Sequence, residues 1–259
     1  MVSTVQNTDV KQKDADRAVV VAVTAGAAFD TGVEDDNGVY RAGVAFPLLQ
    51  ALQKVNERLL EENPDESLLF DVVLITTDSQ QQQQQSSGIM SSTRHYGLEV
   101  SRFCFSSDED FVESLLKNKV HLFLTADRSE VVQASRSGVL SALLDEHTAS
   151  CPSEQLRVLL CGDAIIQPDV GLTPASRQSF SAQLGEMRRR FGLLDSPLSI
   201  SLVTLHGGRE SCGAALRTLR SLGVSVEEAC CLAGAPRGPI LSVLRCHFLL
   251  SDGFKSTED

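Results

Sequence analysis

The sequence predicts an α/β protein with mainly parallel sheets flanked by helices. Short valine-rich runs at residues 18–23 and 70–76 are typical of buried strands. Between them, residues 43–60 carry apolar side chains at near-helical spacing. The same alternation of strands and helices recurs in the second half of the 259-residue chain. Alternating elements of this kind favour parallel strand pairing throughout.

The first half begins after a polar N-terminal stretch. Residues 1–17 lack hydrophobic periodicity and are predicted to form a disordered tail, and the N-terminal α/β half is predicted at 18–150. A further strand is expected at residues 120–124 and a helix at 129–144. The six glutamines at 80–85 are typical of a mobile tract or a helix start, and they carry no chemistry.

The second half follows a polar stretch that contains Pro152. The C-terminal α/β half is predicted at residues 155–253, followed by a short tail at 254–259. Its expected strands and helices, in chain order, are the strand at 156–160, the helix at 183–191, the strand at 198–204, the helix at 212–222 and the strand at 246–250.

Short motifs recur between the halves. The segment LIT at residues 74–76 resembles LVT at 202–204, and HLFLT at 121–125 resembles HFLLS at 247–251. These pairs predict an internal duplication, with ligand sites at the C-terminal ends of the strands. We interpret the two histidines that open the second pair as structural positions of the repeat.

Composition excludes several classes of function. The net charge of −11 and the sequence pI of about 4.9 argue against binding to nucleic acid or to an anionic membrane. No apolar run approaches the length of a membrane span, and the start of the chain does not resemble a signal peptide. Seven cysteines without a CxxC pair indicate reduced thiols. We therefore expect a cytoplasmic protein.

Four polar residues follow predicted strands or a loop in the second half. Asp163 comes after the strand at 156–160, and Thr204 ends the next strand. Arg237 lies in a glycine- and proline-rich loop, and Asp252 follows the last strand. Each also has an ordinary structural interpretation, such as a turn aspartate or a solvated arginine. Their order of acid, hydroxyl, cation and acid favours magnesium-assisted phosphoryl transfer.

Several motifs resemble the type I cytosolic 5′-nucleotidases, in matching order over residues 18–252. They are GVAFPL at 43–48, HYGL at 95–98, CGDA at 161–164, LVT at 202–204, LRTLRS at 216–221 and LAGAPRGP at 232–239. The resemblance implies a Rossmann-like, haloacid dehalogenase-like fold. It also implies magnesium-dependent removal of phosphate from nucleoside monophosphates, AMP especially.

The resemblance also implies roles for single residues. Cys161 stands where the family has its nucleophilic aspartate, and Asp163 matches the general acid and base. Thr204 matches the phosphate-binding threonine, and Arg237 replaces the phosphate-binding lysine. The closing pair of metal-binding aspartates has become Ser251-Asp252, so the implied magnesium ligands are Asp163 and Asp252.

These substitutions lead us to expect weakened magnesium binding and weakened or absent catalysis. A thiol is a poor ligand for magnesium, and loss of a nucleophile costs up to about a millionfold in rate. A cysteine-dependent phosphatase is disfavoured, because no arginine follows Cys161 closely. The family also has a longer segment than residues 167–182 here and continues past its closing aspartates. We therefore expect part of its substrate-binding cap and its last core elements to be missing.

Three hypotheses remain open from the sequence. The first is a residual 5′-nucleotidase acting on AMP. The second is a catalytically inactive pseudoenzyme that binds a nucleotide or a protein partner, as a homo- or hetero-oligomer. The third is a shortened chain that folds poorly and does little.

Overall fold

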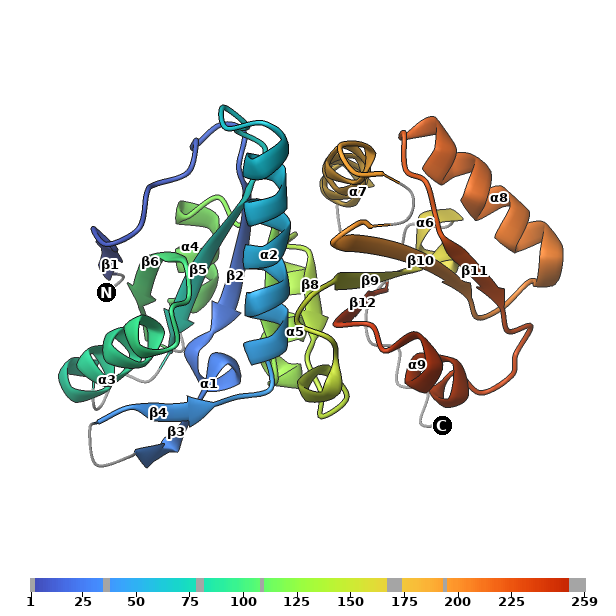
Figure 1. The fold of residues 1–259 in the computed structure, drawn as a ribbon. Helices are drawn as coiled ribbons and strands as arrows, with labels where there is room; N and C mark the ends of the chain where they lie inside the picture. Colours follow the sequence, from blue (N-terminus) through green and yellow to red (C-terminus); the bar gives the residue numbers. More distant parts are fainter. Residues whose placement is uncertain are drawn as a thin grey trace.

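Two mainly parallel sheets, one in each half of the chain, lie side by side in the computed structural model (Figure 1). The structure describes residues 3–34, 38–77, 82–107, 110–166, 174–192 and 195–251. Helices flank both sheets, so the predicted α/β class with mainly parallel sheets is confirmed. No helix within these ranges has the length and apolar character needed to cross a lipid bilayer.

The N-terminal sheet has six strands in the order β1-β6-β5-β2-β7-β8. Every neighbouring pair is parallel except β1 with β6. Its central strand β2 is buried along its whole length, as its valine-rich sequence predicts. The strands are β1 Ser3–Gln6, β2 Val19–Thr24, β5 Phe70–Thr76, β6 Val100–Phe105, β7 Leu122–Thr125 and β8 Ser141–Leu143.

Helices cover both faces of this sheet. Apolar residues of α2 and α3 pack on one face, and those of α4 and α5 pack on the other. The helices are α1 Ala25–Ala28, α2 Phe46–Glu62, α3 Gln82–His95, α4 Phe111–Lys117 and α5 Arg128–Arg136, and a small antiparallel hairpin consists of β3 Phe29–Glu34 and β4 Tyr40–Ala42. Alternate residues of each strand face opposite layers, so this sheet is buried on both sides.

The C-terminal sheet has four parallel strands in the order β11-β10-β9-β12. Helices α7 and α8 pack on one face, and α9 packs on the other. The elements are β9 Leu156–Cys161, α6 Gly162–Ile166, α7 Pro174–Arg189, β10 Leu198–Thr204, α8 Gly208–Ser221, β11 Glu228–Cys231, α9 Gly238–Leu244 and β12 Phe248–Leu250.

Helix α2 joins the two sheets. It packs on β5 and also contacts β9 and the short 3-10 helix Thr148–Ser150 (Figure 1). One continuous apolar core therefore includes residues of both sheets, such as Leu59 and Leu156. This shared core favours cooperative folding of the two halves.

The two sheets have the same strand order. In the N-terminal sheet, β5 and β6 lie on one side of β2, and β7 lies on the other. In the C-terminal sheet, β10 and β11 lie on one side of β9, and β12 lies on the other. The edge strands β1 and β8 are left out of this comparison. His121 precedes β7, and its Nδ1 accepts a hydrogen bond of 3.0 Å from the Val20 N–H. His247 precedes β12 and accepts the matching bond from Arg157, also 3.0 Å. The expected structural role of both histidines fits these contacts, while duplication itself stays a prediction.

Burial of His247 makes the stability of the fold dependent on pH. Burial lowers its pKa to about 4, whereas an unfolded histidine titrates near about 6.5. Below about pH 6.5 the unfolded chain binds a proton that the folded protein does not. The free energy of unfolding should therefore fall by on the order of 3 kcal/mol between about pH 6.5 and pH 4. Urea unfolding across this range measures the change.

A glutamine provides the matched variant, because its side-chain oxygen can accept the Arg157 N–H. In His247→Gln the pH dependence should shrink, and replacement of the exposed His95 by glutamine should leave it unchanged. An undiminished pH dependence in His247→Gln would contradict this account.

Two sequence predictions for the first half were wrong. Part of the expected disordered tail, Ser3–Gln6, forms β1 antiparallel to β6, because the edge of β6 offers unpaired backbone groups. The expected helix at 129–144 ends at Arg136, where Gly138 adopts a φ of 82°. The residues that follow form β8 beside β7. The six-glutamine tract partly belongs to α3, which begins at Gln82.

Candidate phosphohydrolase site

The candidate site lies at the C-terminal ends of β9 and β10. Strand β9 ends at Cys161, and α6 starts at once with Gly162. A Cβ atom at Gly162 would lie 2.5 Å from Cγ2 of Thr204 and 3.0 Å from Cβ of Ala215. Only glycine therefore lets the end of β9 lie this close to β10 and α8. The two strand ends that carry the predicted residues thus lie together, as the parallel topology predicts.

Asp163 in the first turn of α6 points to the loop after β10. Its Oδ2 accepts a hydrogen bond of 2.6 Å from the Leu205 N–H, and its Oδ1 accepts one of 3.4 Å from the His206 N–H. The carboxylate therefore ties two loops of the site together.

Cys161 is buried, with 4% of its surface exposed, and its thiol donates to Oδ2 of Asp163 over 3.7 Å. Burial raises the pKa of the thiol, and the neighbouring charge of Asp163 raises it further. The sulfur is therefore protonated at neutral pH. A neutral thiol is a weak nucleophile and a poor ligand for a hard cation.

Thr204 contributes a hydroxyl without a partner. The residue is fully buried, and its Oγ1 makes no hydrogen bond to the residues that the structure describes. Buried hydroxyl groups are nearly always hydrogen-bonded, so we expect this one to donate to the acceptor of a ligand. Its position at the end of β10 fits the phosphate-binding role implied by the resemblance, which stays a prediction.

The loop that leads to Arg237 folds back over the end of β10. The Leu232 N–H donates to the carbonyl of Thr204 over 2.9 Å, and the Gly234 N–H donates to Leu205 over 2.8 Å. Arg237 then precedes α9, is half-exposed, and forms no ion pair with described residues. The donors of its guanidinium are therefore available to an anion.

The remaining predicted positions lie beside β9. Strand β12 pairs with β9 through Leu250 and Leu160, and Ser251 directly follows it. Asp252 lies outside the described residues. The structure therefore brings Cys161, Asp163 and the end of β10 together and places Ser251 at the same edge.

The described part of this site does not fit magnesium. Within the described ranges, no group of three His, Cys, Asp or Glu side chains could hold a metal ion. Asp163 already accepts backbone hydrogen bonds at both oxygens, and Cys161 offers a protonated sulfur. Magnesium prefers several oxygen ligands in near-octahedral geometry.

Comparison with known proteins decides the family. The family model described as 5′-nucleotidase matches residues 30–171, more than half of the chain. This chain belongs to the 5′-nucleotidase family. It is 31% identical over 248 residues to human (Homo sapiens) cytosolic 5′-nucleotidase 1B. The alignment covers 84% of this chain and 40% of that protein. The chain thus spans about 40% of this curated relative.

A solved structure that aligns with this 5′-nucleotidase family member is only weakly similar to it. A mutant of the PilB minor pilin from Streptococcus sanguinis aligns with a TM-score of 0.17 and 11% identity. The alignment covers 82% of this chain and 56% of the pilin chain. A similarity this weak supports no conclusion on fold or function.

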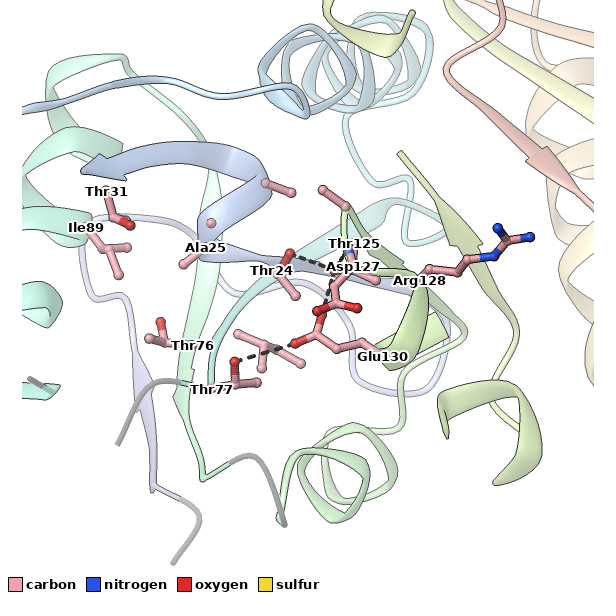
Figure 2. Close-up of a pocket in the computed structure, with 14 residues that line it drawn as sticks. Thr24, Ala25, Thr31, Thr76, Thr77, Ile89, Thr125, Asp127, Arg128 and Glu130 are labelled. Atoms are coloured by element: carbon pink, nitrogen blue, oxygen red, sulfur yellow. Dashed lines mark hydrogen bonds between the residues drawn. The ribbon is translucent and has the colours of Figure 1, made fainter. Parts of the chain in front are cut away.

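The N-terminal sheet has a second pocket, which the sequence did not lead us to expect. A pocket of about 530 Å³ lies at the C-terminal ends of β2, β5 and β7, where Thr24, Thr76 and Thr125 line it (Figure 2). The signal was present in the sequence, because each of these threonines ends an apolar strand. The rule that strand ends carry ligand sites applies equally to this half of the chain.

Proposed function

We propose that this 5′-nucleotidase family member has weakened or lost phosphohydrolase activity and retains the capacity to bind a nucleoside monophosphate, AMP in particular. The hydrogen-bonded pair of Cys161 and Asp163 carries the proposal. The parent reaction needs an ionised carboxylate at position 161, and this chain offers a buried protonated thiol there. The family's magnesium ion belongs to that same reaction and would bind weakly here, because the described ligands do not fit it.

Phosphate binding does not depend on the nucleophile. The orphan hydroxyl of Thr204 and the guanidinium of Arg237 are both suited to phosphate oxygens. Backbone N–H groups of the loop after β10 are partly used by Asp163, so the anion would be held mainly by these two side chains. The chain can therefore bind a nucleotide without hydrolysing it, which favours the function of a nucleotide-binding pseudoenzyme.

The location and the assembly of the chain are part of the proposal. We place the chain in the cytoplasm because the matched human protein is named a cytosolic 5′-nucleotidase. A homo-oligomer, or a hetero-oligomer with an active family member, would let a bound nucleotide act on a partner.

Calorimetric titration of the chain with AMP tests the proposal. We expect a single saturable site, weakened about tenfold or more in Thr204→Val and in Arg237→Ala, because each loses a hydrogen bond to a charged phosphate. Replacement of the exposed Arg220 on α8 by alanine should leave the affinity unchanged. Absence of AMP binding, or equal affinity in all variants, would contradict nucleotide binding at this site.

A further inference from the structure

The pocket in the N-terminal sheet lies at the point where the strand order reverses. Strand β5 pairs with one side of β2, and β7 pairs with the other. Open parallel sheets bind ligands in the crevice beyond the C-terminal ends of such strands. The volume of about 530 Å³ falls in the range of about 300–1,000 Å³ that is usual for small-molecule sites.

Strand registers match this pocket to the candidate phosphohydrolase site. Thr24 of β2 pairs with Ile75 of β5, just as Cys161 of β9 pairs with Val203 of β10. One residue further along β5 and β10, Thr76 corresponds to Thr204. The pocket therefore occupies in its own sheet the place that the candidate site occupies in the other.

The corresponding residues differ in chemistry. Gly26 stands two residues after Thr24, where Asp163 stands two residues after Cys161. The pocket therefore has no acid at the position that matches Asp163, and a threonine at the position that matches Cys161. Its geometry supports ligand binding without phosphoryl transfer.

A chain of hydrogen bonds holds the polar side of the pocket in place. Thr24 donates to Thr125 over 3.2 Å, and Thr125 donates to Oε2 of Glu130 over 2.6 Å. Thr77 reaches Oε1 of the same carboxylate over 3.5 Å (Figure 2). These side chains are positioned before any ligand arrives, which reduces the entropy cost of binding.

Other polar groups keep capacity for a ligand. Thr31 and Thr76 line the pocket, and neither hydroxyl is hydrogen-bonded to a described residue. Asp127 accepts two bonds from Ser129, of 2.6 and 2.7 Å, both at Oδ1. Its Oδ2 therefore keeps acceptor capacity. The bonds from Ser129 also lower the pKa of Asp127, so its carboxylate is ionised at neutral pH.

The charges of the pocket exclude an anionic ligand. Two carboxylates, Asp127 and Glu130, line it, and Figure 2 shows the guanidinium of Arg128 pointing away from the other labelled side chains. A phosphate would therefore meet negative charge, and no cation of the described residues that line the pocket faces it. Hydroxyl groups of a neutral ligand, by contrast, donate well to a carboxylate.

Apolar side chains also line the pocket. Ile89 lies across from Asp127 and Glu130 in Figure 2, and Ile75, Ala25 and Ala27 also line the space. A pocket with both apolar and hydrogen-bonding side chains suits a molecule with a flat ring at one end and hydroxyl groups at the other.

We propose that this pocket binds a neutral ligand of the nucleoside class, with its sugar hydroxyls on Asp127 and Thr76 and its base against Ile75 and Ile89. The proposal goes beyond the phosphohydrolase site and does not depend on its state. It assigns the two sheets different ligands, an uncharged one here and a phosphate-bearing one at Thr204.

Calorimetric titration of the full chain with adenosine tests the proposal. Asp127→Asn keeps the acceptor for Ser129 and replaces Oδ2 by a donor, so the affinity should fall about tenfold to a hundredfold. Gly26→Leu should block the pocket, and a Cβ there meets no atom within 4 Å, so the fold should tolerate it. Thr204→Val, in the other sheet, should bind adenosine with unchanged affinity.

Titrations with AMP and with D-ribose test which parts of adenosine the pocket recognises. In the Thr204→Val background, AMP should bind about tenfold or more weakly than adenosine, because its phosphate meets the carboxylates. D-ribose, which lacks the base, should also bind much more weakly. The proposal is overturned if adenosine does not bind, or if D-ribose matches it, or if AMP binds more tightly in that background. It is equally overturned if Asp127→Asn and Gly26→Leu, both with unchanged melting curves, bind as the unmodified chain does.

Discussion

Replacing Cys161 by aspartate is expected to create magnesium-dependent release of phosphate from AMP, on the order of a thousandfold or more above the unmodified chain. The substitution supplies the carboxylate that the family reaction needs, at the end of β9 and beside Asp163. Thr204, Arg237 and the backbone around them are unchanged by it. Phosphate release at saturating AMP measures the gain.

The same variant offers a readout that is independent of catalysis. The new carboxylate would lie near Oδ2 of Asp163, which is 3.7 Å from the present sulfur. Two buried like charges destabilise the fold unless a cation lies between them. Magnesium should therefore raise the melting temperature of Cys161→Asp and leave those of the unmodified chain and of Cys161→Ser unchanged. An inactive Cys161→Asp that magnesium does not stabilise would refute the proposed site.

The largest loss of stability is expected for Phe123→Ala, at about 3–5 kcal/mol in the free energy of unfolding. Phe123 is fully buried in β7, and its ring lies 5.9 Å from that of Phe111 on α4. Truncation leaves a cavity between the sheet and α4 that neighbouring side chains cannot fill without moving from their rotamers. Urea unfolding measures the loss.

The matched control is Val243→Ala on α9, whose side chain is 73% exposed. We expect its free energy of unfolding to change by less than about 0.5 kcal/mol. A loss below about 1 kcal/mol in Phe123→Ala would show that the packing described for β7 and α4 is not that of the folded protein.

Fold class was predictable because the central strands are buried on both faces. Runs such as Val19–Thr24 and Phe70–Thr76 must be apolar throughout in a covered parallel sheet, which makes them visible in the sequence. Among the strands that were missed, β1, β8 and β11 are short and lie at the sheet edges, where pairing rather than burial defines them. Strands β3 and β4 pair only with each other, and β6 was missed although it is largely buried. The residues before β8 alternate in polarity, which favours a longer helix, but Gly138 in a left-handed conformation follows the end of α5 at Arg136.

The position of the candidate site could be predicted from the sequence, but the burial and hydrogen bonds of its residues could not. Asp163 and Thr204 follow apolar strands, and the parallel topology brings strand ends together. Neither the backbone donors of Leu205 and His206 nor the burial of Cys161 can be inferred from strand periodicity. Burial is the largest cause of the raised pKa of the Cys161 thiol, and the charge of Asp163 raises it further.

The most direct test of the central claim is phosphate release from AMP by the unmodified chain, with magnesium present, compared with Asp163→Asn. Asp163 is the acid and base that the family resemblance implies, so any family-type hydrolysis should require it. Our account predicts that both proteins release phosphate at the same low rate, because Cys161 cannot act as the nucleophile. Rapid release by the unmodified chain that Asp163→Asn abolishes would contradict the account.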